Sequence, residues 1–286
     1  MEVIFQRPGD IVIGVRDGSV DFGITGRDIY LEKRDNNGKI LELHSQLGFA
    51  KCTLNVIVPD DWAAVDSLED LQQYQIALGR PLKVATKFPH LTEKFFQSET
   101  EIPFEVIQAE GALEIAPTVG YADVIVDLVS TGTTLRDNRL KKLPGGKLLD
   151  AEACLIANRQ RLKDSPETLA IAIQLLEMIG AHLRGRRNLA IFANIRAGSQ
   201  EEIAEKIFQK EVISGLQGPT VSPILTRDAK PFFAIHVVVK KEMLHKAIRE
   251  IREIGGSGVV VSPVNYIFEE EPPELNAMLA ALEESA

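Results

Sequence analysis

The sequence has few cysteines and no long apolar run. Only two of its 286 residues are cysteine, Cys52 and Cys154, and they lack the spacing of a metal-binding pair. Both lie in apolar stretches, so we expect buried free thiols in a reducing, cytosolic compartment. No stretch resembles a signal peptide or is long enough to span a bilayer, which argues against an integral membrane protein.

Positive charge is also scarce. The chain has 32 Lys and Arg against 41 Asp and Glu, a net charge of −9, and no basic block. An acidic chain of this kind is a poor candidate for binding nucleic acid or a membrane surface. A small anionic ligand remains possible because it needs only a local site. The composition is typical of a globular protein, and the length suffices for two or three compact units.

Predicted strands and helices alternate through the first two thirds of the chain, which indicates an α/β fold with a mainly parallel sheet. The expected strands are residues 2–5, 20–24, 40–43, 52–58, 83–86, 104–108, 124–126 and 148–158, with a basic hairpin at 141–147. The expected helices are residues 11–16, 28–33, 66–74, 91–97 and 166–186, with a further helix ending near Gly120.

The last third has a different order. Strands are expected at 189–194, 221–225, 232–239 and 259–264, and helices at 201–209 and 242–254. This βαββαβ order is typical of a ferredoxin-like module. We therefore expect a domain boundary near Arg187, a glycine loop at 255–258, and a frayed acidic tail after Glu269.

The stretch from Ala122 to Arg136 has the layout of a phosphate-binding loop. A buried strand precedes an acid, a hydroxyl-rich glycine loop follows, and a helix-compatible segment starts at Leu135. Backbone N–H groups at a helix start bind anions, and glycine permits close approach. The residues concerned are Asp127, Ser130, Thr131, Gly132, Thr133 and Thr134. An ordinary helix cap uses the same residue types, so that alternative stays open.

Three segments together resemble one enzyme family. They are Gly18–Glu32, Glu110–Leu140 and Gly218–Ile224, and in this order they are similar to ATP phosphoribosyltransferase in its long form. The resemblance implies a catalytic part with two lobes like type II periplasmic binding proteins, followed by a ferredoxin-like (PII-like) regulatory domain. The expected ranges are 1–82 with 160–187 for the first lobe, 83–159 for the second, and 188–286 for the regulatory domain.

The resemblance also implies an activity. The family joins ATP to 5-phosphoribosyl 1-diphosphate with Mg²⁺, releasing diphosphate and phosphoribosyl-ATP in the first step of histidine biosynthesis. It further implies inhibition by histidine and a homo-oligomer that interconverts between dimer and hexamer. The transition state should be oxocarbenium-like, so we expect catalysis by positioning and electrostatics rather than by a catalytic triad.

The family match assigns roles to particular residues. Asp127 and Glu114 are the expected catalytic residues; the metal ligands stay unassigned. Substrate binding is expected from Glu110, Gly111, Ser130, Thr131, Gly132, Thr133, Thr134, Gly23, Gly26 and Asp28. Histidine binding is expected from Leu216, Thr220, Gly256, Ser257 and Gly258. Asp28 fits a helix cap as well as a ligand, and both interpretations stay open.

One feature departs from the family pattern. Family members carry a strand, a Lys-Gly-Arg turn and a helix ahead of the segment that matches Glu2–Phe5, and these basic residues help to hold the diphosphate. The sequence here begins past that region, so we expect a truncated enzyme with an exposed sheet edge in its first lobe. The alternative is a catalytically impaired homologue that binds a small molecule or regulates a partner.

Overall fold

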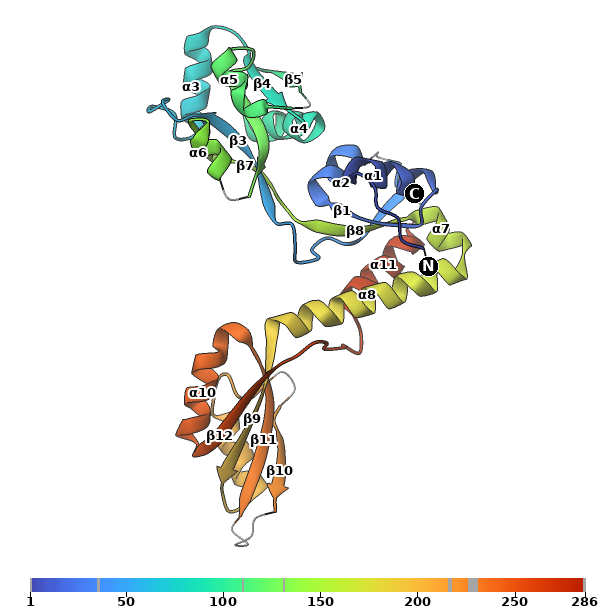
Figure 1. Cartoon of the computed structure of the whole chain (residues 1–286), viewed down its shortest axis with the longest axis vertical. Coiled ribbons are helices and arrows are strands. Elements are labelled where there is room, and N and C mark those ends of the chain that lie inside the picture. Colours follow the sequence, from blue (N-terminus) through green and yellow to red (C-terminus); the bar gives the residue numbers. More distant parts are fainter. Residues whose placement is uncertain are drawn as a thin grey trace. The chain divides into compact units, whose positions relative to one another are not determined.

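The computed structural model describes residues 2–34, 37–109, 111–130, 132–215, 218–225 and 231–284 (Figure 1). The chain divides into two compact units, Met1–Ala172 with Ala277–Ala286, and Ile173–Asn276. Across the described residues the strands form three sheets. No helix in this part of the chain combines the length and apolar character needed to cross a lipid bilayer.

The first sheet belongs to a small lobe, here called lobe I. Its three strands have the order β1-β8-β2, and both pairings are antiparallel. The strands are β1 (Phe22–Gly26), β2 (Ile40–His44) and β8 (Ala153–Asn158), and the helices are α1 (Pro8–Asp17), α2 (Arg27–Lys33) and α7 (Arg159–Asp164). Val12 and Val15 of α1 pack with Cys154 and Ile156 of β8 to form the lobe I core, because apolar residues three apart share one helix face.

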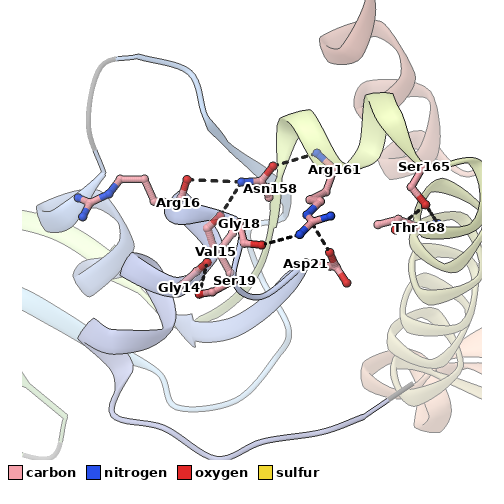
Figure 2. Close-up of polar contacts among 10 residues, drawn as sticks. All are labelled: Gly14, Val15, Arg16, Gly18, Ser19, Asp21, Asn158, Arg161, Ser165 and Thr168. Atoms are coloured by element: carbon pink, nitrogen blue, oxygen red, sulfur yellow. Dashed lines mark hydrogen bonds and ion pairs between the residues drawn. The ribbon is translucent and has the colours of Figure 1, made fainter.

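Asn158 joins three elements of lobe I (Figure 2). Its side chain accepts a hydrogen bond from the Arg161 backbone N–H at 2.9 Å, which caps α7. Its amide also donates to the Val15 carbonyl at 2.8 Å, near the end of α1. Arg161 donates to the Gly18 carbonyl at 3.1 Å, so the C-terminal end of α1 is held against the start of α7. Helix α7 was not among the helices expected from the sequence.

The second sheet belongs to a larger lobe, here called lobe II. Its five strands have the order β5-β4-β6-β3-β7. Strands β4, β5 and β6 are parallel, and β3 is antiparallel to β6 and β7. The strands are β3 (Cys52–Pro59), β4 (Leu82–Thr86), β5 (Phe104–Gln108), β6 (Val124–Val129) and β7 (Leu140–Ala151). The helices are α3 (Leu68–Leu78), α4 (Pro89–Glu99), η1 (Leu113–Ile115), α5 (Ala116–Val119) and α6 (Thr133–Asp137).

The second compact unit has its own sheet, with the order β10-β11-β9-β12 and only antiparallel pairings. Its strands are β9 (Asn188–Arg196), β10 (Thr220–Ile224), β11 (Phe232–Lys240) and β12 (Gly256–Pro263), and its helices are α9 (Gln200–Phe208), η2 (Lys241–Met243) and α10 (Leu244–Glu253). The order βαββαβ confirms the expected ferredoxin-like module. Two further helices, α8 (Pro166–Arg187) and α11 (Pro273–Glu283), have residues in both units.

The expected fold class is confirmed: two α/β lobes are followed by a ferredoxin-like domain. The expectation of a mainly parallel sheet was wrong, because only β5, β4 and β6 pair in parallel, and the other described pairings in the two lobes are antiparallel. The limits of the lobes differ from those expected. Cys52–Pro59 pairs with β6 and β7, so the chain enters the lobe II sheet at Cys52 rather than near residue 83. The chain leaves lobe II after Ala151, and β8 already belongs to lobe I.

Four local predictions were wrong. Residues 2–5 form no strand, and Val3 and Phe5 are exposed, because no described strand pairs with this segment. The expected hairpin at 141–147 is part of β7, whose pairing with β3 is irregular. The expected strand at 148–158 is two strands, β7 and β8, in different lobes. The tail is not frayed but forms α11, which buries Met278.

Candidate active site

The carboxyl ends of the parallel strands β4 and β6 lie next to each other in lobe II. Thr86 pairs with Val126 in register, and its hydroxyl donates to the Val126 carbonyl at 2.8 Å. Lys87 directly follows β4, and Asp127 follows Val126 within β6. The two side chains are close enough for their charges to interact. An acid and a base are thus neighbours at the strand ends, where ligands of open α/β sheets bind.

Asp127 is half-buried, and burial raises the pKa of its carboxyl above the ordinary value. The Leu128 backbone N–H, which donates to its Oδ1 at 2.8 Å, and the positive charge of Lys87 oppose this rise in the pKa. The negative charge of Glu114 adds to it. The two expected catalytic carboxylates are therefore close enough to interact.

Glu114 reaches this position through a strained turn. Ala112 has a positive φ of 46°, which turns the chain into η1, and Leu113 is buried beneath it. Gly111 is exposed, and a Cβ added there would meet nothing within 4 Å. The backbone at Gly111 is therefore accessible to a ligand. Glu110 lies outside the described residues.

The hydroxyl-rich loop follows β6 directly. Gly132 has a φ of 74° and precedes α6, and it offers no side-chain cap to the first turn of that helix. Ser130, Thr133 and Thr134 are exposed. Because α6 has only five residues, its dipole is small, and the local N–H and hydroxyl donors are the main attraction for an anion. Thr131 lies outside the described residues.

The lobe I turn is built differently. A Cβ at Gly23 would lie 2.4 Å from Ile11 Cγ2, and a Cβ at Gly26 would lie 2.3 Å from Asp28 Oδ1. Asp28 is only 5% exposed at the start of α2. Burial raises the pKa of its carboxyl, and hydrogen bonds from its own backbone N–H and that of Ile29 oppose the rise. Asp28 is the second residue of α2 and not its N-cap, which is Gly26, but its carboxyl is bonded within the first turn of the helix, which favours a structural role over ligand binding.

The described residues that are expected to bind histidine do not lie close together in the folded domain. Thr220 lies on β10, and Gly256, Ser257 and Gly258 lie on β12, at the opposite edge of the four-stranded sheet. Strands β11 and β9 separate them, which corresponds to roughly 14 Å at about 4.8 Å per strand. The expected glycine loop is also part of β12, with a bulge after Ser257. Leu216 lies outside the described residues.

Basic residues that sequence analysis missed line a cavity of about 1270 Å³ between lobe I and lobe II. They are Arg16, Lys33, Arg34, Lys87, Lys94 and Lys147. Lys87 had a recognisable signal, because it directly follows a predicted buried strand as Asp127 does. The other five basic residues had no such sequence signal, because they come from segments that are distant along the chain. Among the described residues, none of those expected to bind substrate lines this cavity, and Lys87 connects it with Asp127.

A metal ion at this site would need donor atoms from a bound substrate in addition to those of the protein. Among the residues that the structure describes, no group of three or more His, Cys, Asp and Glu side chains could hold a metal. Asp127 and Glu114 form a pair of carboxylates. Mg²⁺ commonly binds one or two carboxylates together with substrate phosphates, so the donors present fit Mg²⁺ carried by a phosphorylated substrate.

Comparisons with known proteins identify the family of the chain. The family model described as ATP phosphoribosyltransferase matches residues 7–180, and the model of that family's C-terminal domain matches residues 186–266. The chain is 41% identical over 288 residues to "ATP phosphoribosyltransferase 2, chloroplastic" of Arabidopsis thaliana, covering 98% of this chain and 70% of that protein. It is 36% identical to the ATP phosphoribosyltransferase of Gemmatimonas aurantiaca, covering 93% of this chain and 85% of that protein.

Among solved structures, an ATP phosphoribosyl transferase (HisG:HisZ) complex from Thermotoga maritima aligns with a TM-score of 0.49 and 22% identity, over 61% of this chain and 77% of that one. The family models together span both compact units, and the relatives match along nearly the whole length. The chain therefore belongs to the ATP phosphoribosyltransferase family.

Proposed function

We propose that this chain is a pentosyltransferase that joins ATP to 5-phosphoribosyl 1-diphosphate, forming phosphoribosyl-ATP and diphosphate in the first step of histidine biosynthesis. The observation that carries the proposal is the match to ATP phosphoribosyltransferases over 98% of the chain. The lobe II edge supports it, because Asp127 lies beside an exposed loop of hydroxyl groups and glycine.

The loop from Ser130 to Thr134 binds the 5-phosphate in this proposal. Its exposed hydroxyls and the backbone N–H groups at the start of α6 are donors, and Gly132 lets the phosphate approach the backbone. The Asp127 carboxylate accepts hydrogen bonds from ribose hydroxyls. Holding the phosphate and the ribose together fixes the reacting carbon, which is the main source of rate enhancement when no covalent intermediate is needed.

Charge stabilisation at the reacting bond comes from groups of both signs. The sugar gains positive charge in the transition state, and the nearby Asp127 and Glu114 carboxylates stabilise it. The departing diphosphate gains negative charge, and Lys87 is the nearest cation identified beside Asp127. Mg²⁺, when bound by these carboxylates and the substrate, supplies further neutralisation of the diphosphate.

ATP brings a second polyanion to the site. The basic cavity beside Lys87 offers a place for its triphosphate, since cations outnumber acids along its lining. The adenine would then lie toward the lobe II edge, where its ring nitrogen attacks the ribose. This nitrogen is uncharged and needs no general base, which agrees with the absence of a predicted catalytic triad.

Regulation is a separate part of the proposal. We propose that histidine inhibits the enzyme through the ferredoxin-like domain, which the C-terminal family model matches. Since Thr220 and Ser257 lie on opposite sheet edges, Thr220→Ala and Ser257→Ala distinguish which edge binds the inhibitor. The half-inhibitory histidine concentration should rise for only one of them, and Ser262→Ala on β12 serves as control. Analytical ultracentrifugation with and without histidine tests the proposed dimer and hexamer.

We also propose a reducing compartment such as the cytosol, which the free thiols of Cys52 and Cys154 support.

The experiment for the main proposal is a turnover assay that follows phosphoribosyl-ATP by ultraviolet absorbance. Purified chain is mixed with ATP, 5-phosphoribosyl 1-diphosphate and Mg²⁺, and the product is identified by mass spectrometry. Product that requires all three components supports the proposal. A folded chain that binds neither substrate and makes no product contradicts it.

A further inference from the structure

A carboxylate of lobe I caps a helix of lobe II. Helix α4 begins at Pro89, which has no N–H, and its N-cap residue Phe88 makes no side-chain cap. The backbone N–H groups of His90 and Leu91 are therefore without a partner inside their own helix. Glu32, near the end of α2, accepts from both: Oε1 from His90 and Oε2 from Leu91, each at 3.0 Å.

The contact is more than one pair of hydrogen bonds. The His90 ring nitrogen Nδ1 lies 3.0 Å from the Glu32 carbonyl oxygen and 3.2 Å from its Oε1. The Glu32 side chain is buried. Burying a carboxylate is costly unless it is hydrogen-bonded, and here the partners lie in the other lobe. Separation of the lobes would leave both the carboxylate and the two N–H groups unpaired until water replaced them.

An apolar contact reinforces the same junction. Ile29, three residues before Glu32 and so on the same face of α2, packs against the cores of both lobes. One helix of lobe I thus presents an apolar and an anionic group to lobe II. The junction is three residues from Lys87, the residue that adjoins both Asp127 and the basic cavity.

We propose that Glu32 is an interlobe latch that holds lobe I against the N-terminus of α4 and so sets the opening of the substrate cleft. In the latched state the cap on α4 is complete and the lobes are close. When the latch is broken, lobe I is free to swing away, and groups that both lobes present to a substrate are separated. Glu32 also lines the basic cavity, but its carboxylate oxygens accept from α4, and the transfer reaction as proposed gives it no role.

Hydrogen exchange tests the latch directly, because it reports on the two amides that Glu32 accepts from. In the wild type, the His90 and Leu91 amides should exchange slowly. In Glu32→Ala they should exchange at least tenfold faster, while Phe95 and Phe96 in the buried part of the same helix stay protected. Glu93→Gln is the matched control, because Glu93 is an exposed carboxylate on α4. Unchanged exchange at His90 and Leu91 in Glu32→Ala would overturn the proposal.

Pulsed electron–electron double resonance measures the distance between the two lobes directly. Spin labels attached through non-canonical amino acids at Asp17 and Gln97, both exposed, report on lobe I and lobe II and leave the native thiols in place. The wild type and Glu93→Gln should give one narrow distance, and Glu32→Ala a longer, broader distribution. Glu32→Gln keeps the side-chain volume but can accept only one of the two hydrogen bonds. Its distance distribution should therefore lie between those of the wild type and Glu32→Ala. If the alanine variant does not fold, Glu32→Gln is compared with the wild type instead. Identical distributions in all four proteins would refute the latch.

Kinetics connect the latch with catalysis. Opening the lobes should raise KM for both substrates several-fold and change kcat less. Failure of the transferase proposal would appear as no product from the wild type. Failure of the latch would appear as unchanged exchange and distances, so the two outcomes are distinguishable.

Discussion

Two turns in this molecule use nearly the same residue types and end up with different surroundings. In lobe I, β1 leads through Gly23, Thr25 and Gly26 to Asp28 at the start of α2. In lobe II, β6 carries Asp127 and leads through Gly132 to the threonines of α6. Both have a strand, glycine, hydroxyl, acid and a helix, so both resemble ligand loops in sequence.

The two turns differ in how tightly their glycines are packed and in how exposed their side chains are. A Cβ at Gly23 would clash with Ile11, the Thr25 hydroxyl donates to the Pro8 carbonyl at 3.1 Å, and Asp28 is buried at the start of α2. In lobe II the nearest atom to a Cβ at Gly132 is Val129 Cγ1 at 4.0 Å, and the threonine side chains are exposed. A turn whose glycine and acid are packed into a core holds the lobe together, whereas one with open space at its glycine and exposed side chains can bind a ligand.

The largest predicted effect is on catalysis at the lobe II turn. Asp127→Asn should lower kcat/KM on the order of 100-fold, because the variant loses the charge that stabilises the transition state. The variant should also be more stable thermally, since the fold no longer holds a carboxylate whose pKa is raised by burial. Steady-state kinetics and a thermal melt measure both. Asp150→Asn, an exposed acid of the same lobe, is the control.

The opposite result for Asp127→Asn would contradict the distinction between the lobe I and lobe II turns. If Asp127→Asn kept full activity and lost stability, Asp127 would be a structural residue like Asp28.

The second effect is on stability at the lobe I turn. Gly23→Ala should lower the free energy of unfolding by about 1–3 kcal/mol, because a methyl group would be forced against Ile11 and Val15 in a filled core. Gly111→Ala in lobe II has open space around it and should change stability by less than about 0.5 kcal/mol. Chemical denaturation compares the two. Equal losses would show that the lobe II turn is packed as tightly as the lobe I turn.

The third effect separates the two substrates. Thr133→Ala combined with Thr134→Ala should weaken binding of 5-phosphoribosyl 1-diphosphate about tenfold, since one or two hydrogen bonds to a charged group are lost. ATP binding should change little. Isothermal titration of each substrate checks this. Equal weakening for ATP would mean that the loop does not distinguish the sugar phosphate.

The fourth effect concerns pH. Asp127 must be ionised to accept from ribose hydroxyls, and its pKa is raised, so kcat/KM should fall with decreasing pH at a higher pH than for an ordinary aspartate. The sign for stability is opposite: the folded state holds the proton more tightly than the unfolded one, so Asp127 lowers stability as the pH rises through its raised pKa. A pH–rate profile of the wild type measures the first. An acid limb at the ordinary pKa of aspartate would contradict the burial argument.

The smallest effect concerns backbone strain beside the site. Ala112→Gly should stabilise the fold by about 0.5 kcal/mol, because relief of a left-handed conformation, about 1–2 kcal/mol, exceeds the entropy lost by glycine, about 0.5–1 kcal/mol. A denaturation midpoint measures it. Destabilisation would show that Ala112 is held by contacts rather than strained.

Sequence analysis predicted most elements because their signals are local. Phe104–Gln108 was predicted with the bounds of β5, and the helix expected to end near Gly120 has Gly120 as its C-cap. The errors came from pairing that is not local. Whether Cys52–Pro59 joins lobe I or lobe II depends on partners more than 65 residues away, such as Leu128, which no periodicity in 52–59 encodes.

The candidate site divides in the same way. Asp127 and its loop are contiguous, so spacing alone indicated them. Lys87 joins Asp127 only through the β4–β6 pairing, and Glu32 reaches His90 only when two lobes meet. Spacing also could not tell a glycine needed for packing, such as Gly23, from one that leaves room for a ligand, such as Gly132.

The central claim is that lobe II binds the sugar phosphate at the turn after β6. A crystal structure of the chain with 5-phosphoribosyl 1-diphosphate and Mg²⁺ tests it most directly. The account predicts the 5-phosphate within hydrogen-bond distance of the Thr133 and Thr134 N–H groups and a ribose hydroxyl on Asp127. A phosphoribosyl group bound instead among Lys33, Arg34 and Lys94, with the turn empty, would contradict it.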